Sequence, residues 1–245
     1  MKLEEYLLVI EKFLKDYLEY THMNTYVLGL SGGVDSSLVA AISRKAVGKE
    51  KLMCIMIPID SIPADLKDAI EVCKQLDLNY MVLDQSKAFH EIVASFKANG
   101  EEITKEVAAN IKARIRMLTL YAFAQSHRGL VLGTDNAAER YTGYFTKFGD
   151  GAADVMPIVH LLKREIVVAT KLYGLSNNLA ERVPSAGLYE GQTDELEMGI
   201  TYKDLDDYLL GKEIPVEVRE RIEYLHRISE HKRREAPSPV KFERD

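Results

Sequence analysis

The hydrophobic and polar positions of the chain follow two different spacings, and these predict helices and buried strands in alternation. Between residues 3 and 20, apolar side chains recur every three or four positions among charged ones, which is typical of an amphipathic helix. Residues 25–30 form a short, continuous apolar run, which favours a buried strand. The same reasoning predicts further strands at 51–59, 79–84, 129–134 and 153–158, and helices at 38–47, from 63 onwards, and at 86–97, 104–127, 163–173, 203–210 and 215–234.

This alternation predicts how the elements are arranged. A helix between two strands usually returns the chain to the same edge of the sheet, so the strands run parallel, and right-handed crossovers place helices on both faces. We therefore expect an α/β fold with a doubly wound parallel sheet. No composition break marks a linker, so residues 1–245 are expected to form one domain with helical additions at the N- and C-terminal ends. Residues 184–200 have little hydrophobic pattern and are expected to form a mobile loop.

Composition excludes some classes of protein. Of the 245 residues, 47% are hydrophobic and 29% are charged, as in ordinary globular proteins. The formal net charge of −6 argues against a nucleic-acid partner, because such affinity comes from neutralising phosphates. No run approaches the ~18 apolar residues of a membrane span, and no signal-peptide layout is present, so we expect no membrane partner and a cytoplasmic location. Cys54 and Cys73 lie in apolar stretches and are expected to be buried thiols, which fits a reducing compartment.

The clearest chemical feature is the segment Ser31-Gly32-Gly33-Val34-Asp35-Ser36, which links a predicted strand to the following helix. Two adjacent glycines let backbone N–H groups approach an anion without interference from a Cβ atom, and a helix N-terminus adds unpaired donors and partial positive charge. The Asp35 carboxylate beside that anion makes chemical sense if a divalent cation lies between them. The segment is neither a Walker A loop nor a GxGxxG turn. A tight turn in which Asp35 caps the helix is the simpler alternative, but the whole string at a strand–helix junction favours phosphate binding.

This segment resembles the pyrophosphate-binding loop of the ATP pyrophosphatases, which activate a carboxyl or carbonyl oxygen by adenylylation. Further strings resemble, in the same order, those of the ammonia-dependent NAD synthetases within that superfamily, and the resemblance covers nearly the whole chain. These strings are residues 110–116 (NIKARIR), 132–139 (LGTDNAAE), 144–154 (YFTKFGDGAAD), 157–164 (PIVHLLKR) and 231–233 (HKR). The resemblance implies that the protein amidates deamido-NAD with ammonia and consumes ATP, which gives NAD, AMP and pyrophosphate through an acyl-adenylate.

The resemblance also assigns residues to ATP and Mg²⁺. Glu139 follows the end of a predicted strand, so a reversal of winding direction between the first and fourth strands would bring Glu139 and Asp35 to one crevice, where both could bind Mg²⁺. Ser185 matches a hydroxyl that binds phosphate, whereas Gly187 stands where the family has an acidic residue. The residues expected to bind ATP are Gly29, Leu30, Ser31, Gly32, Gly33, Val34, Asp35, Ser36, Ser37, Thr134, Lys163 and Ser185.

The remaining assignments concern the second substrate and catalysis. By resemblance, the residues that contact deamido-NAD are Arg114, Lys147, Asp154, His231 and Lys232. Asp150 and Lys163 are implied to be catalytic: Asp150 lies near the reacting carboxylate, where it could hold ammonium, and Lys163 reaches the ATP phosphates. Lys163 also stands at a predicted helix start, where the helix dipole disfavours a cation, so an anionic partner is expected. Glu197 is a candidate ligand for a second metal ion. Without the resemblance, most of these residues would be interpreted as solvated surface charges.

Chain length and the family resemblance also bear on partners and on alternative functions. The chain is too short to hold both this domain and a glutamine-hydrolysing domain, so free ammonia is the expected nitrogen source. The resemblance implies a homodimer, and the long helix at 104–127 is the expected contact. Alternative functions are the synthetase part of GMP synthetase, a tRNA-thiolating enzyme, and a nucleotide-binding sensor. The segments at 148–154 (FGDGAAD) and 231–234 (HKRR) argue against the first, the positions of the cysteines against the second, and the full set of acidic and basic site residues against the third.

Overall fold

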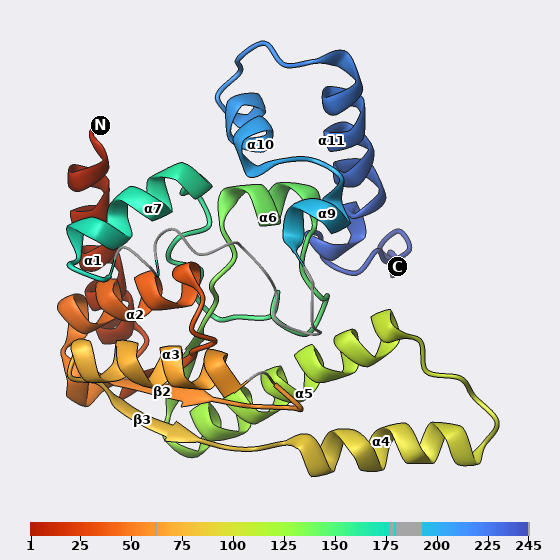
Figure 1. The fold of residues 1–245 in the computed structure, drawn as a ribbon, viewed down its shortest axis with the longest axis horizontal. Coiled ribbons are helices and arrows are strands. Elements are labelled where there is room, and N and C mark those ends of the chain that lie inside the picture. Colours follow the sequence, from red (N-terminus) through yellow and green to blue (C-terminus); the bar gives the residue numbers. More distant parts are fainter. Residues whose placement is uncertain (62, 177–178, 180–192, 245) are drawn as a thin grey trace.

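The protein is built on a four-stranded parallel sheet, which in Figure 1 lies at the lower left, below α2 and α3. The computed structural model describes residues 1–61, 63–176, 179 and 193–244. The strands are β1 (Thr25–Gly29), β2 (Leu52–Met56), β3 (Asn79–Val82) and β4 (Gly129–Leu132), and their order in the sheet is β3-β2-β1-β4. Each neighbouring pair is parallel. The chain winds outward from β1 to β3 and then crosses to the other side of β1, which confirms the doubly wound parallel sheet.

Helices connect the strands and extend the fold at both ends (Figure 1). The helices around the sheet are α1 (Leu3–Tyr20), α2 (Val34–Val47), α3 (Pro63–Gln75), α4 (Ser86–Ala98), α5 (Lys105–Ser126), α6 (Ala137–Thr142) and α7 (Lys163–Leu172), with a 3-10 turn η1 (Lys49–Lys51) before β2. The C-terminal part contains α9 (Asp194–Met198), α10 (Tyr202–Leu209), α11 (Val216–Ile228) and a 3-10 turn η2 (Glu230–Lys232).

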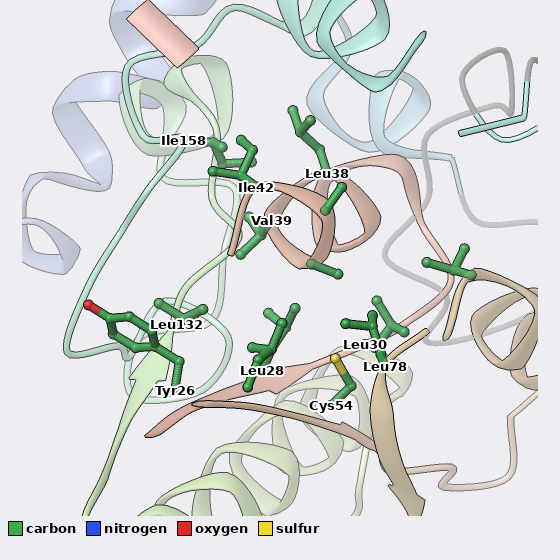
Figure 2. Close-up of a cluster of buried hydrophobic side chains, with 14 of the residues drawn as sticks. Tyr26, Leu28, Leu30, Leu38, Val39, Ile42, Cys54, Leu78, Leu132 and Ile158 are labelled. Carbon is green, nitrogen blue, oxygen red and sulfur yellow. The ribbon is translucent and has the colours of Figure 1, made fainter. Parts of the chain in front are cut away.

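The side chains of β1 alternate between two hydrophobic cores, one on each face of the sheet. Tyr26 and Leu28 belong to the core formed with α1, α2, α3 and α7, whereas Val27 belongs to the core formed with α4 and α5. Figure 2 shows Val39 of α2 on the side of the helix that faces Leu28. The buried Tyr26 hydroxyl donates a hydrogen bond to the carbonyl oxygen of Leu14 on α1 at 2.8 Å, which satisfies the polar atom that it brings into the core.

A third hydrophobic cluster joins the C-terminal helices to α6 rather than to the sheet. It contains Ala138 of α6, Met198 of α9, Leu205 of α10 and Ile222 of α11. In Figure 1, α10 and α11 lie beyond α6, away from the strands. The position of these helices relative to the sheet is therefore set mainly through α6 and, by ion pairs of Arg164, through the start of α7.

Several predicted elements are shorter in the structure: the strands predicted at 51–59, 79–84 and 129–134 end at Met56, Val82 and Leu132. In place of the strand predicted at 153–158, the structure has an isolated parallel bridge between Leu132 and Val155. Pro157 explains the early end, because proline has no N–H with which to continue a ladder. The helix predicted at 215–234 is also shorter, because α11 is followed by the 3-10 turn η2.

Two short helices were not expected from the hydrophobic pattern. The helix α6 is too short for a clear periodicity, but its ends are encoded: Asn136 and Glu139 form a capping box, and Gly143 takes the left-handed C-cap conformation. The prediction of a loop at 184–200 is wrong for the part that contains α9, and residues 184–192 lie outside the described residues.

Other general expectations concern membranes and cysteines. In the described part of the chain, no helix is both long enough and apolar enough to cross a membrane. Cys54 and Cys73 are both buried and free, as predicted. A hydrogen bond from Cys73, together with burial, raises the pKa of the Cys54 thiol.

Candidate active site

A cavity of about 550 Å³ lies at the carboxyl ends of β1 and β4, where the winding direction of the sheet reverses. Connections leave neighbouring strands toward opposite faces at such a point, and a crevice forms between them. The cavity wall includes Gly29 and Leu30 at the end of β1, and Gly133 and Thr134 after β4. The two loops that the sequence predicts to border one crevice therefore do so.

The loop between β1 and α2 is braced by its own serines. The Ser31 hydroxyl lies 3.0 Å from the Ser36 hydroxyl and accepts the N–H of Gly33 at 3.2 Å, and the Ser37 hydroxyl donates to the Gly33 carbonyl at 2.8 Å. Gly33 is the N-cap of α2, so no carbonyl within the helix can accept the amides of residues 34–36. Residues 33–36 line the cavity, so this helix end can bind an anion there.

Gly32 fixes the loop against α3. Its φ angle is +84°, and a Cβ atom at this position would lie 2.7 Å from the carbonyl oxygen of Asp65 and 3.1 Å from the amide nitrogen of Ala69. Any side chain would therefore force the loop and α3 apart. Glycine at position 32 keeps the N-terminus of α2 directed at the cavity.

A buried lysine joins this loop to the opposite side of the crevice. Lys163 Nζ lies 2.6 Å from Asp35 Oδ2 and 3.9 Å from Glu139 Oε1, and its side chain is 7% exposed. Asn136 Nδ2 donates to the other Asp35 oxygen at 3.1 Å. Asp35 and Glu139, which the sequence predicts on one crevice, thus meet at the same ammonium group.

The start of α7 shows how a lysine can occupy that position. The Asp206 carboxylate on α10 accepts the backbone N–H of Lys163 at 3.1 Å and that of Arg164 at 3.0 Å. This negative charge offsets the unfavourable interaction of a cation with the N-terminal end of a helix. The side chain of Lys163 extends to Asp35, so the anionic partner predicted for Lys163 is present.

Burial changes the pKa values of this cluster. Desolvation raises the pKa of Glu139 well above its usual range, the Asp35 charge adds to that rise, and Lys163 opposes it. Burial disfavours the charged form of Lys163, but the carboxylates of Asp35 and Glu139 outweigh it and raise the pKa of Lys163. Lys163 is therefore an ammonium ion at neutral pH.

The same groups fit a magnesium ion. Asp35 and Glu139 already lie on either side of one cation, and carboxylate oxygens are the ligands that Mg²⁺ prefers. Among the described residues, no group of three or more His, Cys, Asp or Glu side chains could hold a metal ion alone. A site with two carboxylates suits an ion whose remaining ligands are phosphate oxygens and water.

Two further carboxylates, Asp135 and Asp150, line the cavity. Asp135 is 4% exposed, and its Oδ2 atom has no hydrogen-bond partner among the described residues. Burial, with a further contribution from Asp150, raises the pKa of Asp135 to about 8. Asp150 is solvent-exposed on the cavity wall, and desolvation by the surrounding groups raises its pKa, although its Oδ1 atom accepts the N–H of Thr146 at 3.0 Å. Asp135 can therefore bind or release a proton near neutral pH.

A series of basic residues lies beside these acids. Lys232 lines the cavity and donates to two carbonyl groups of the 143–145 segment, both at 2.7 Å, and burial lowers its pKa. Arg114 donates to the carbonyl oxygen of Lys147 at 3.4 Å, and Lys147 Nζ donates to the carbonyl oxygen of His231 at 2.7 Å. Four of the residues predicted to contact deamido-NAD thus come together, although Lys232 alone of the four is on the cavity wall.

Most residues predicted for ATP, metal and catalysis also line the cavity. The predicted residues on its wall are Gly29, Leu30, Ser31, Gly33, Val34, Asp35, Ser36, Thr134, Glu139, Asp150, Lys163, Glu197 and Lys232. Gly32 and Ser37 instead support the loop between β1 and α2: Gly32 packs against α3, and the Ser37 hydroxyl donates to the Gly33 carbonyl. Ser185 and Gly187 lie outside the described residues.

Asp154 lies at the sheet rather than on the cavity wall. Its Oδ2 atom accepts the N–H of Val131 at 2.8 Å, and its Oδ1 atom accepts the hydroxyl of Tyr121 at 3.3 Å. These contacts give Asp154 a structural role at the edge of β4. Its contact with deamido-NAD stays a prediction.

Sequence reasoning overlooked several polar residues of the site. Arg116 lines the cavity and donates to the carbonyl oxygen of Ile57 at 3.2 Å. Arg116 and Asp135 lie inside strings that carry the family resemblance, so a survey of every polar residue in those strings would have found them. Asp194 and Tyr202 lie outside those strings; Asp194 lines the cavity, and the Tyr202 hydroxyl contacts both Asp194 and Glu139.

Comparison with known proteins agrees with this geometry. The family model for NAD synthase matches residues 6–236. The NH(3)-dependent NAD(+) synthetase of Mesoplasma florum is 41% identical over 244 residues, which cover 100% of both chains. Among solved structures, NMN synthetase from Francisella tularensis has a TM-score of 0.93 and 37% identity, over 98% of this chain and 100% of that one. NH3-dependent NAD synthetase from Campylobacter jejuni has a TM-score of 0.80 and 26% identity, again over 98% and 100%.

These matches extend over the sheet, the phosphate loop, the cavity and the C-terminal helices. The motifs that carry the resemblance are therefore part of a sequence similarity that extends over nearly the whole chain. The chain belongs to the NAD synthase family of ATP-dependent ligases, which form a carbon–nitrogen bond.

Proposed function

We propose that this protein amidates deamido-NAD with ammonia, with ATP as the activating substrate and Mg²⁺ as the cofactor, to give NAD, AMP and pyrophosphate. The observation that carries the proposal is the meeting of an anion-binding helix end with Lys163, Asp35 and Glu139 in one cavity. This arrangement suits a polyphosphate chain with its metal ion. Membership of the NAD synthase family supports the choice of reaction.

In the first half-reaction, the nicotinate carboxylate of deamido-NAD attacks the α-phosphorus of ATP and pyrophosphate leaves. The reacting groups are anionic, so the barrier falls when fixed positive charge surrounds them. The amides of residues 34–36 and the ammonium of Lys163 would bind the phosphates. Asp35 and Glu139 would hold the Mg²⁺ ion, which, when bound, neutralises phosphate charge.

In the second half-reaction, ammonia attacks the carbonyl carbon of the acyl-adenylate. A C–N bond forms, the C–O bond to AMP breaks, and NAD and AMP leave. Ammonium must lose one proton before the attack, and the attacking nitrogen loses a second as it becomes an amide. Asp150 lines the cavity with a raised pKa, so its carboxylate is a stronger base than usual and can bind ammonium and accept a proton from it. The bound substrates would fill the partly open cavity and exclude water from it, which would limit hydrolysis of the acyl-adenylate.

The dinucleotide would extend out of the cavity across the basic residues. Arg114, Lys147 and His231 lie beside the wall rather than on it, and Lys232 marks the cavity end of the series. Part of this binding surface would come from a second copy of the chain in a homodimer. The helix α5 supports that arrangement, because its Leu118 side chain is 65% exposed.

A second candidate function is the same amidation on a smaller substrate, nicotinic acid mononucleotide, with NMN as the product. The observation that favours it is the similarity to NMN synthetase from Francisella tularensis, whose TM-score of 0.93 exceeds the 0.80 of the NAD synthetase from Campylobacter jejuni. Both reactions transfer ammonia to the same adenylylated carboxylate. They differ in what occupies the space beyond the ribose phosphate.

One assay separates these functions. The protein is incubated with ATP, Mg²⁺ and ammonium, and with either deamido-NAD or nicotinic acid mononucleotide, and NAD, NMN and AMP are measured. We expect NAD and AMP in equal amounts and a higher kcat/KM for deamido-NAD. A higher kcat/KM for the mononucleotide would establish the second function, and AMP formation without either amide would exclude both.

A pair of variants connects the activity to the cavity. Asp35→Asn should abolish turnover, because it removes one predicted metal ligand and the closest partner of Lys163. Asp16→Asn, at an exposed ion pair on α1, is the matched control and should retain the activity. Wild-type turnover by Asp35→Asn would remove Asp35 from the mechanism.

A further inference from the structure

Tyr202 extends from the C-terminal helices to the group formed by Lys163, Asp35 and Glu139. It is the first residue of α10, and it is 5% exposed. Its hydroxyl lies 3.1 Å from Glu139 Oε1 and 2.9 Å from Asp194 Oδ2. Its ring lies against Lys163, with the ammonium nitrogen 4.8 Å from the ring centroid. One aromatic side chain therefore contacts three charged groups of the cavity wall.

These contacts hold the two carboxylates and the ammonium group in place. A tyrosine hydroxyl carries one hydrogen, so a single donor lies between two carboxylates that would otherwise repel each other. This donor holds the Glu139 and Asp194 carboxylates on either side of it. The negative face of the ring stabilises the ammonium of Lys163, which is favourable in a buried site where water cannot solvate the charge.

Tyr202 is itself held firmly. Its backbone N–H donates to Glu195 Oε1 at 2.8 Å, and the preceding Thr201 caps α10 by accepting the N–H of Asp204. The side chain packs in the cluster that joins α6 to the C-terminal helices. The position of the Glu139 carboxylate thus depends on a part of the chain that provides none of the strands.

We propose that Tyr202 is a positioning residue for the divalent cation: its hydroxyl orients the Glu139 carboxylate, so that the C-terminal helices set the affinity of the cavity for a divalent cation with its nucleotide. The inference rests on the proposed function, because it takes Glu139 as a metal ligand. It adds a residue that acts on the metal through Glu139.

The test compares two tyrosine-to-phenylalanine variants on the same helix. Tyr202→Phe removes the hydroxyl and keeps the ring. Tyr208→Phe is the matched control, because it also removes one hydroxyl hydrogen bond on α10, but the partner of that hydroxyl is Tyr141, at 3.1 Å, rather than a carboxylate of the cavity wall. Binding of Mn²⁺ in the presence of ATP is measured from the electron paramagnetic resonance signal of free Mn²⁺, and thermal denaturation of each variant checks its fold.

For Tyr202→Phe we expect Mn²⁺ to bind about tenfold more weakly, which is the loss typical of a hydrogen bond to a charged group. The Mg²⁺ concentration for half-maximal activity should rise by a similar factor, and kcat at saturating Mg²⁺ should change by less than about twofold. Tyr208→Phe should bind Mn²⁺ as the wild type does. Unchanged Mn²⁺ affinity in Tyr202→Phe, or an equal loss in Tyr208→Phe, would overturn the proposal.

The two arms also separate this inference from the proposed function. If the wild-type protein forms neither NAD nor NMN, the proposed function fails, whereas the Mn²⁺ titrations still show whether Tyr202 affects cation binding. If the wild-type protein forms NAD but the titrations show no difference, the role of Tyr202 fails by itself.

Discussion

Asp135 offers a direct test of the electrostatics of the cavity through the stability of the folded protein. Its carboxyl is 4% exposed, and burial raises its pKa from 3.8 to about 8, with Asp150 and Asp35 adding to the rise while Arg140 and Lys232 oppose it. Between these two pH values, the folded protein keeps a proton on Asp135 that the unfolded chain has released. The free energy of unfolding therefore falls as the pH rises through this window, by about 1.4 kcal/mol per pH unit.

The variant Asp135→Asn removes this titration and keeps the shape of the side chain. Urea denaturation of the ligand-free protein at pH 5.5 and 7.5 gives the free energy of unfolding for the wild type and the variant. Relative to the variant, the free energy of unfolding of the wild type should fall by about 2.5 kcal/mol between pH 5.5 and 7.5. This is a little less than the full slope gives, because Asp135 begins to ionise near pH 7.5.

The control is Asp77→Asn. A hydrogen bond from Lys49 lowers the pKa of the exposed Asp77 carboxyl, so Asp77 titrates below this window. The free energies of unfolding of wild type and control should therefore differ by the same amount at both pH values. A constant difference between wild type and Asp135→Asn would mean that Asp135 is ionised in the folded protein. The assignment of a proton-binding carboxyl to this part of the cavity would then be wrong.

Three further predictions concern the loop, the start of α7 and assembly. Gly32→Ala should lower the free energy of unfolding by at least about 1 kcal/mol more than Gly48→Ala, because both positions have positive φ but a Cβ atom at 48 has nothing within 4 Å; equal losses in thermal denaturation would contradict this. Asp206→Ala should cost about 1–2 kcal/mol in urea denaturation, the usual effect of losing a helix cap, and an unchanged midpoint would show that the cap is unimportant. Leu118→Glu should convert the proposed dimer into a monomer in sedimentation velocity at micromolar concentration, because it would place an unpaired charge in the proposed contact of the exposed Leu118; a monomeric wild type would exclude the dimer.

The order of the elements could be predicted from the sequence because it depends on local spacing. Apolar residues at helical or strand spacing indicate one buried face without knowledge of any distant partner. The anion-binding character of residues 31–37 could also be predicted from the sequence, because these residues are contiguous and their chemistry depends on the helix that they begin. The conflict between Lys163 and the dipole of its own helix was also local, and it correctly predicted an anionic partner.

Tertiary structure decided which groups meet and what their neighbours do to them. Asp35 and Lys163 are 128 positions apart, and no local spacing in the sequence predicts a contact at that separation. The pKa of Asp135 depends on burial, which is a property of the packed molecule and not of the residue. Tyr202 belongs to the site because packing on α6 places a C-terminal helix against a carboxylate that follows β4. Side chains from elements that are remote in sequence became neighbours only when the hydrophobic faces of those elements were buried together.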